Sequence, residues 1–123
     1  MDNLSNEALI RIYQILIYSA NLCHRTIMEV CVNANYDSRN VFYRVTKGQC
    51  KKITFVKIAI GANVPLDLFY EYLECANIQL SPKYSKTNYI LMDYIISHQT
   101  DHGADYDIDE INNRLLDEGL DTL

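Results

Sequence analysis

Residues that interrupt regular structure are scarce in this chain, which has four glycines and two prolines among 123 residues. Long polar tracts are missing as well, and 49% of the residues are hydrophobic. This composition excludes a disordered body and supplies enough apolar side chains for a core. The length fits one domain, or one domain with an extension.

A long apolar run is also missing. The longest uncharged stretch near the start, residues 12–24 (IYQILIYSANLCH), is too short and too polar to span a bilayer, which needs roughly 20 apolar residues. Asp2 and Glu7 precede this stretch and no basic segment does, which argues against a signal peptide. We therefore expect a cytoplasmic protein that does not interact with membranes.

The cysteines form no metal-binding or redox motif. None of the four belongs to a CxxC pair, and no spacing resembles that of a zinc site. We expect reduced and mostly buried thiols, with a disulfide framework as the less favoured alternative. The residues are Cys23, Cys31, Cys50 and Cys75.

Histidine and carboxylate patterns give little support for a metal or for catalysis. His98 and His102 are four residues apart with Asp101 between them, a spacing that can bind a metal on one helix face. Gly103 follows directly and favours a solvated helix end instead. The chain has no glycine-rich phosphate loop, no nucleophile elbow and no paired carboxylates in an apolar setting. We predict a protein that is not an enzyme and uses no metal or cofactor.

Charge is distributed unevenly along the chain. Residues 1–60 contain eight basic and four acidic side chains, a net of +4, whereas residues 61–123 contain three and twelve, a net of −9; together these give the chain's −5. Residues 38–57 contain six basic residues and no acidic one. A basic segment inside an acidic protein indicates an anionic partner. Its bases are Arg39, Arg44, Lys47, Lys51, Lys52 and Lys57.

Hydrophobic periodicity predicts an all-α protein, because apolar residues recur at helical spacing and no segment alternates long enough to require a strand. Residues 53–60 (ITFVKIAI) favour a strand by propensity alone. We predict a five-helix domain over residues 1–80 and a helical, acidic C-terminal extension over residues 81–123. The expected helices are one capped by Ser5 that runs to Ala20, then 26–33, 38–47, 54–62, one opened by Pro65, 86–98 and 109–117.

A stretch of the basic half, RTIMEVCVNANYDSRNVFYRVTKG, has the pattern of a helix-turn-helix. Val32 supplies the compact side chain that the crossing of two helices needs, and ANYD forms a polar turn. Ser38 or Asp37 is a natural N-cap for the second helix, and Gly48 ends that helix.

The second helix, residues 38–47, has two different faces. Phe42 and Val45 are expected to anchor it in the core, and the opposite face is polar. Arginine reads guanine and asparagine reads adenine through paired hydrogen bonds in the major groove, whereas lysines meet phosphates. We predict base contacts from Arg39, Asn40, Tyr43 and Arg44, and phosphate contacts from Ser38, Lys47, Lys51 and Lys52.

From about Leu9 to Leu73 the chain resembles the Xre/Cro/C1-type helix-turn-helix repressors of phages and bacteria. The segments SRNVFYRVTKG and ITFVKIAIGANVPLDLF carry the resemblance, and the second is similar to the family's fourth helix and its entry to the fifth. The resemblance implies a sequence-specific transcriptional regulator that binds double-stranded DNA as a homodimer. The family's left-handed turn glycine is replaced by Tyr36 with Asn35 beside it; asparagine tolerates this conformation, which predicts a shifted turn.

The sixth expected helix, residues 86–98, is amphipathic and has more apolar residues than one domain needs. Such a helix usually has a partner. We therefore expect it to supply much of a dimer interface, through Tyr89, Ile90, Met92, Tyr94 and Ile96.

A function of another class stays open for the same fold. Some mobile-element proteins keep a repressor-like fold but bind a protein, as certain anti-CRISPR proteins do, and the acidic C-terminal region would suit a protein partner. Residues 101–121 also fit a solvated tail, and the basic residues fit an ordinary solvated face. We expect the ten tyrosines to pack helix faces rather than to stack on bases.

Overall fold

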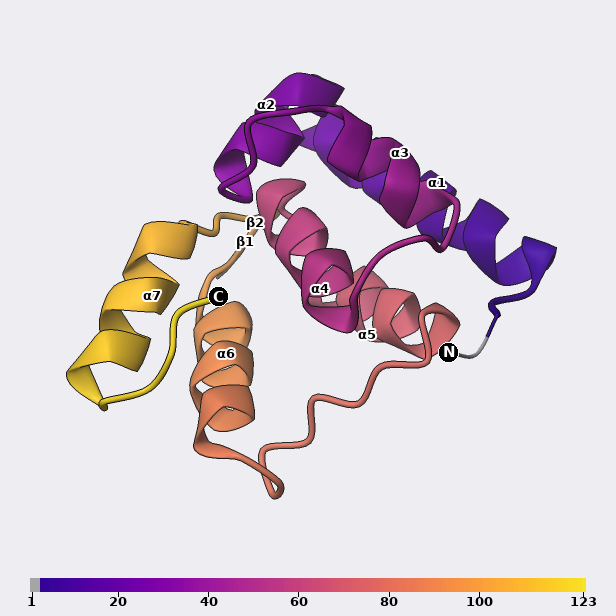
Figure 1. Cartoon of the computed structure of the whole chain (residues 1–123). Coiled ribbons are helices and arrows are strands. Elements are labelled where there is room, and N and C mark those ends of the chain that lie inside the picture. Colours follow the sequence, from indigo (N-terminus) through magenta and orange to yellow (C-terminus); the bar gives the residue numbers. More distant parts are fainter. Residues whose placement is uncertain (1–2) are drawn as a thin grey trace.

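Seven helices and one short hairpin make up the computed structural model, which describes residues 3–123 (Figure 1). The chain is mostly helical, as predicted, and residues 53–60 are helical despite their strand propensity. The hairpin, in which β1 (Gln99–Thr100) pairs with antiparallel β2 (Gly103–Ala104), lies between α6 and α7, in a segment where the sequence predicts neither a helix nor a strand. The helices are α1 (Asn6–Leu22), α2 (Ile27–Asn33), α3 (Asn40–Thr46), α4 (Lys52–Gly61), α5 (Leu66–Cys75), α6 (Lys86–Ser97) and α7 (Ile108–Asp117).

Polar side chains begin several helices, as the sequence predicts. The Ser5 hydroxyl accepts from the backbone N–H of Ala8 at 3.1 Å, which caps α1. The expected N-cap of α3 is wrong, because this helix begins at Asn40 and Arg39 holds the cap position. The Ser38 hydroxyl instead accepts from the Asn40 N–H at 3.2 Å, in a local turn that leads into the helix.

Left-handed residues end α1 to α5 and α7. In each case the N–H of the following residue bonds back across the last turn, as Gln49 does to the Arg44 carbonyl at 2.8 Å. Gly48 has the left-handed conformation as predicted, and Asn35 has it in the α2–α3 turn, which confirms the expected shift away from Tyr36. Asparagine thus does at several helix ends what glycine usually does. The six residues are His24, Asn35, Gly48, Asn63, Asn77 and Gly119.

Helix α4 lies at the centre and packs against α2, α3 and α7 (Figure 1). Its backbone lies close to that of α2 at Gly61, where an added Cβ would lie 2.2 Å from the carbonyl oxygen of Val30. The Arg25 guanidinium also donates to the Gly61 carbonyl at 2.6 Å. Val32, which was expected where α3 crosses α2, is 51% exposed, and the neighbouring Cys31 is buried instead.

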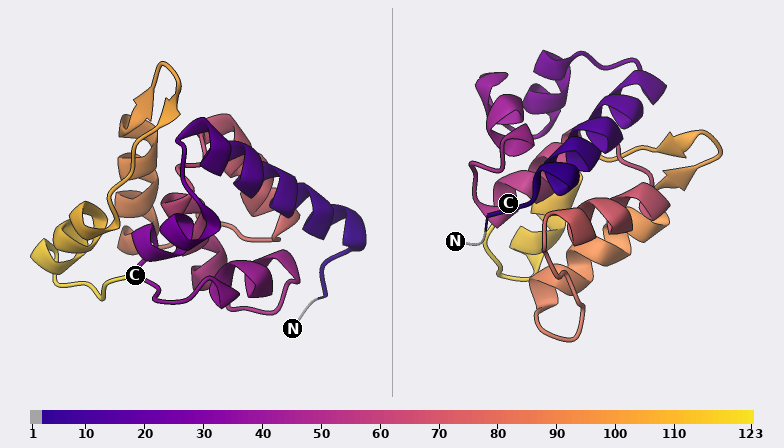
Figure 2. Two further views of the ribbon diagram at one scale, coloured as in Figure 1. Left: turned by 90° about the horizontal axis from the view of Figure 1, so that it is seen from above. Right: turned by 90° about the vertical axis from the view of Figure 1, so that its right-hand side faces the viewer.

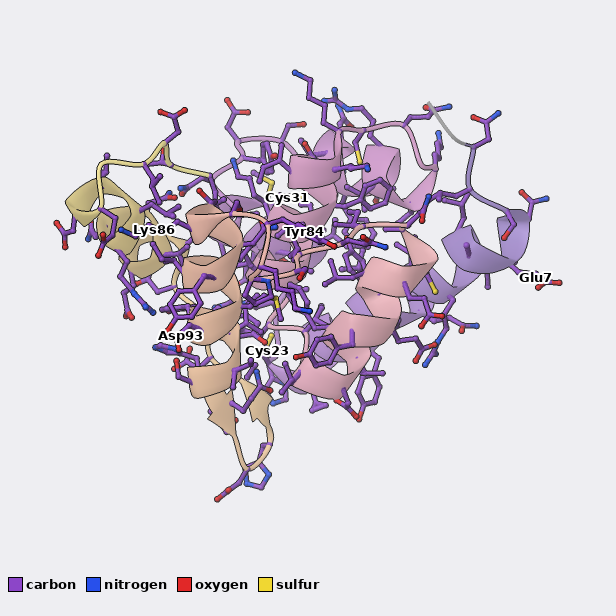
Figure 3. All side chains as sticks on the ribbon, turned by 90° about the horizontal axis from the view of Figure 1, so that it is seen from below. Glu7, Cys23, Cys31, Tyr84, Lys86 and Asp93 are labelled. Carbon is purple, nitrogen blue, oxygen red and sulfur yellow. The ribbon has the colours of Figure 1, made fainter. Side chains whose placement is uncertain are left out.

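Helices α6 and α7 pack antiparallel and share one continuous core with the first five helices. Their contact is flanked by ion pairs of Lys86 with Glu118 at 2.5 Å and of Asp93 with Arg114 at 2.9 Å. Lys86 and Asp93 both lie on the α6 side that faces α7 (Figure 3). Since apolar residues of α7 such as Ile111 and Leu115 are fully buried, the last helix belongs to the folded body and is not a solvated tail.

A chain of hydrogen bonds joins the α4–α5 junction to the segment around the hairpin. The Asn63 side-chain oxygen accepts from the Tyr106 N–H at 2.8 Å, and the Tyr106 hydroxyl donates to the Val64 carbonyl at 2.6 Å. The Gln99 side-chain oxygen accepts from the Leu66 N–H at 2.9 Å, which satisfies a donor in the first turn of α5. The hairpin itself projects from the body beyond these contacts (Figure 2). Residues 1–80 and 81–123 are therefore connected by buried polar contacts as well as by the core.

Candidate nucleic-acid interface

Helix α3 separates the residues of its two faces as the sequence predicts. Phe42 and Val45 are fully buried and Val41 is nearly so, which fixes the helix on α1 and α4. The four predicted base-contacting residues, Arg39, Asn40, Tyr43 and Arg44, are all exposed. The buried face therefore determines which side of the helix is available to a partner.

The lysines continue the exposed surface of α3 toward the start of α4. Lys47, Lys51 and Lys52 are exposed, and Ser38 is half-buried. Within residues 3–123, none of the bases in the predicted contact set forms an ion pair with a carboxylate. We call this exposed surface, made of Arg39, Asn40, Tyr43, Arg44, Lys47, Lys51 and Lys52, the basic face.

The first turn of α4 carries positive charge where a helix favours negative charge. Lys51 is its N-cap and Lys52 its first residue, no side chain caps the helix, and no acidic residue lies in the first turn. The N-terminus of a helix is equivalent to roughly half a positive charge, so cations there are unfavourable and anions are favourable. This end of α4 is thus electrostatically suited to an anionic partner.

Aromatic side chains flank the basic face on the side of α1. The Phe42 ring meets the Tyr13 ring edge-on at 6.3 Å and the Tyr43 ring at 5.9 Å. Tyr13 is 47% exposed and Tyr43 42%. The sequence alone does not indicate Tyr13 as a neighbour of this surface, because only the packing of α1 on α3 brings it there.

The sixth base of the run, Lys57, belongs to a different environment. Its ammonium group lies over the Tyr36 ring, 4.4 Å from the centroid, and the Tyr36 hydroxyl donates to Thr54 at 3.2 Å. This cation–π contact ties the α2–α3 turn to α4. Lys57 therefore stabilises the connection rather than extending the basic face.

Cysteine chemistry has no part at this surface. Burial raises the pKa of Cys50 to about 11, and the nearby positive charge of Arg44 acts in the opposite direction without cancelling the effect. The thiol is therefore protonated at neutral pH and is a poor nucleophile. All four cysteines are free, with Cys31 buried and the others half-buried.

The predicted dimer interface on α6 is partly wrong. Ile90, Met92 and Tyr94 are 4%, 5% and 1% exposed, because the contacts of α6 with the rest of the core cover them. Tyr94 is held further by the Asp107 N–H, which donates to its hydroxyl at 2.8 Å, and by the stacked His98 ring at 3.7 Å. Tyr89 and Ile96 are 56% and 51% exposed and are the two members left on the surface.

The histidine pair does not share a helix face, because α6 ends at Ser97 and His98 is its C-cap. His102 lies in the turn of the hairpin. No group of three or more histidine, cysteine, aspartate or glutamate side chains suited to a metal occurs in the described part of the chain. No helix among these residues is both long and apolar enough to cross a membrane.

Comparison of the chain with protein-family models, with curated proteins and with solved structures found no match.

Proposed function

We propose that this protein is a sequence-specific DNA-binding regulator of transcription that inserts α3 into the major groove. The observation that carries the proposal is the basic face: all four residues predicted to read bases are exposed on α3 and its N-cap, and among the described residues no carboxylate forms an ion pair with its arginines and lysines. Arginine and asparagine on such a helix provide bidentate contacts to guanine and adenine.

The N-terminus of α4 supports the second part of this proposal, contact with the phosphate backbone. Lys51 and Lys52 add charge to a helix end that already favours anions, and the helix has no acidic residue in its first turn. In the proposed complex a phosphate offsets the repulsion between these two lysines and the positive end of the α4 helix dipole. Lys47 and Ser38 would hold phosphates at either end of α3.

The proposal includes repression as a homodimer and membership in the Xre/Cro/C1-type family. A two-fold dimer matches a near-palindromic operator, since each copy presents one recognition helix to one half-site. Tyr89 and Ile96 are seven residues apart on α6, both exposed, and supply a small apolar surface for this contact. A Tyr89→Glu variant should then be monomeric by analytical ultracentrifugation and bind a single half-site.

Selection from a random pool of DNA duplexes, followed by affinity measurements across a salt series, tests the main proposal. Arg44→Ala should weaken binding to the selected duplex by about 1–3 kcal/mol, roughly five- to 150-fold. It should also relax the preference for one base at a single position of the DNA site. Lys51→Ala should weaken binding to all duplexes alike and reduce the salt slope by about one. Lys83→Ala, which removes an exposed base outside the basic face, is the control. Unchanged affinity in Arg44→Ala together with absence of salt dependence contradicts the proposal.

A second candidate is inhibition of a protein partner through the acidic half. It is favoured by the concentration of exposed carboxylates between the hairpin and the end of α7, among them Asp105, Asp109, Glu110 and Asp117. Co-purification of a stoichiometric protein partner, lost on replacing these carboxylates by amides and accompanied by no DNA retardation, would favour this function over the first.

A further inference from the structure

A groove of about 460 Å³ lies between α5 and α6, beside the connection that follows α5. This volume lies in the range of sites that bind small molecules, about 300–1,000 Å³. Its walls are mostly apolar: Tyr70 and Leu73 of α5 form one side, Met92 and Ile96 of α6 the other, and the connection over residues 77–82 the end. None of the residues that line the groove belongs to the basic face, so the groove is distinct from the proposed DNA-binding surface.

The walls of the groove are held in place by the fold. Asn77 ends α5 in the left-handed conformation, and the Ile78 N–H donates to the Leu73 carbonyl at 2.9 Å. Farther along, the Asn88 side chain donates to the Ser81 carbonyl at 3.3 Å and so ties the connection to α6. A ligand would therefore enter a largely preformed site and would not have to order the connection.

The charge of the groove selects the class of ligand. Its lining contains no lysine, arginine or histidine, and Glu74 is its one carboxylate. Tyr70, which is 50% exposed at the groove, adds an aromatic face that attracts a cation. Anions such as fatty acids and nucleotides would meet like charge and find no basic partner here.

We propose that the groove binds a small cationic molecule with an aromatic or aliphatic body, the apolar part lying against Leu73, Met92 and Ile96 and the positive group near Glu74 and Tyr70. None of the groove residues belongs to the basic face, and of the groove residues only Ile96 also belongs to the proposed dimer surface.

Thioflavin T, a cationic aromatic dye whose fluorescence rises in apolar sites, tests the proposal, with anilinonaphthalene sulfonate as the anionic counterpart. We expect the full chain to bind the cation more tightly than the anion. Glu74→Gln should weaken binding of the cation by about two- to fivefold, as expected for a partly exposed charge contact. Asp117→Asn removes one exposed carboxylate of the same half outside the groove and should leave the affinity unchanged.

Ile96→Arg tests the apolar wall, because it places a bulky cation in the groove at a position that is 51% exposed and tolerant of polar side chains. We expect a loss of about tenfold or more in affinity for the cation. Leu116→Arg, a similar change at a position of α7 that is 59% exposed and lies outside the groove, should bind as the parent does. Equal binding by the parent and by both Glu74→Gln and Ile96→Arg overturns the assignment, as does equal affinity for the two dyes.

Methionine methyl labelling provides a readout that needs no variant. Met92 lines the groove, whereas Met28 is exposed on α2. Addition of the cationic dye should shift the Met92 methyl signal and leave that of Met28 in place. A shift confined to Met28 overturns the proposal, and loss of dye binding as protein concentration rises would show instead that a second copy occupies the groove.

Discussion

Asn63 and Tyr106 join two segments that are 43 residues apart, through a 2.8 Å hydrogen bond from the Tyr106 N–H to the Asn63 side chain. Asn63 has a second role, because its left-handed backbone ends α4. We predict that Asn63→Gly, which keeps the backbone conformation available, destabilises the fold by about 1–3 kcal/mol because the Tyr106 N–H loses its buried partner. Denaturant unfolding measures this change.

Asn77→Gly is the matched control, since Asn77 is left-handed at the end of α5 but exposed. Glycine relieves the left-handed strain there, so its stability should be unchanged or slightly higher. Equal destabilisation by the two changes would contradict a specific role for the Asn63 side chain.

Gly61→Ala should be among the most damaging small substitutions in the protein. Its backbone is helical, but the added Cβ would lie 2.2 Å from the Val30 carbonyl oxygen, so α2 and α4 must separate. We expect a loss of about 3 kcal/mol, near the upper end for overpacking. Gly119→Ala, where nothing lies within 4 Å, should cost only the strain of its positive φ of 70°, about 1 kcal/mol. Thermal unfolding of both variants gives the ranking, and the reverse order would refute the close approach.

Lys52→Glu should raise stability and lower affinity for DNA at once. It exchanges a cation for an anion in the first turn of α4, which favours the folded state by about 0.3–1 kcal/mol. Lys47 is the C-cap of α3, where a positive charge is favourable, so Lys47→Glu should lower both quantities. Thermal unfolding at low salt combined with the DNA salt series separates the two effects. A stability loss in both variants would count against the electrostatic interpretation of the α4 terminus.

Alkaline pH should unfold the protein through its buried tyrosines. Burial raises the pKa of Tyr106 to about 12 and that of Tyr94 to about 12, from an ordinary value of 10.0, and raises that of fully buried Tyr72 in the same direction. A raised pKa means that the unfolded chain releases its protons first. The associated stability is therefore complete below pH 10 and is lost as the pH rises toward 12.

Tyr106→Phe should make this loss shallower while lowering stability at neutral pH, because the hydroxyl bonds to Val64 and Gln99 disappear. Tyr89→Phe, at an exposed position, should change neither the stability at neutral pH nor its loss at alkaline pH. Free energies of unfolding measured from pH 7 upward distinguish the two variants, and an identical alkaline slope in Tyr106→Phe would be the contrary result.

Local signals in the sequence predicted much of the helical structure. The signals that worked each act within one helix, so the sequence alone shows them. They are the Ser5 cap of α1, Gly48 at the end of α3, and the buried Phe42 and Val45 among exposed polar residues of α3. Helix α3 begins at Asn40 and not at residue 38 as predicted, because the Ser38 hydroxyl forms a hydrogen bond in a turn before the helix. At the expected crossing of α2 and α3, Val32 and Cys31 are both compact, and only the rotation of α2 decides which of them is buried.

Long-range contacts account for what the sequence did not show. Apolar residues of α6 were interpreted as a partner surface, whereas the same chain buries Met92 and Tyr94. The spacing of Ile111, Leu115 and Leu116 predicted a helix, but the acidic surroundings concealed that this helix completes the core: Ile111 and Leu115 are fully buried, and Leu116 is 59% exposed. Strands of two residues, as in the hairpin, are too short to leave a periodic pattern.

The bonds from Tyr106 to Asn63 and Val64, and from Gln99 to Leu66, also set an order of events during synthesis. The polar groups at the α4–α5 junction acquire their partners only after residues about forty positions later have left the ribosome, and contacts so distant in sequence form slowly. Pulse-labelled hydrogen exchange during refolding should show the N–H groups of Leu66 and Tyr106 becoming protected together. The centre of the molecule is thus completed by residues made after it, and a ribosome that stalls before residue 99 holds a chain whose α4–α5 junction lacks these partners.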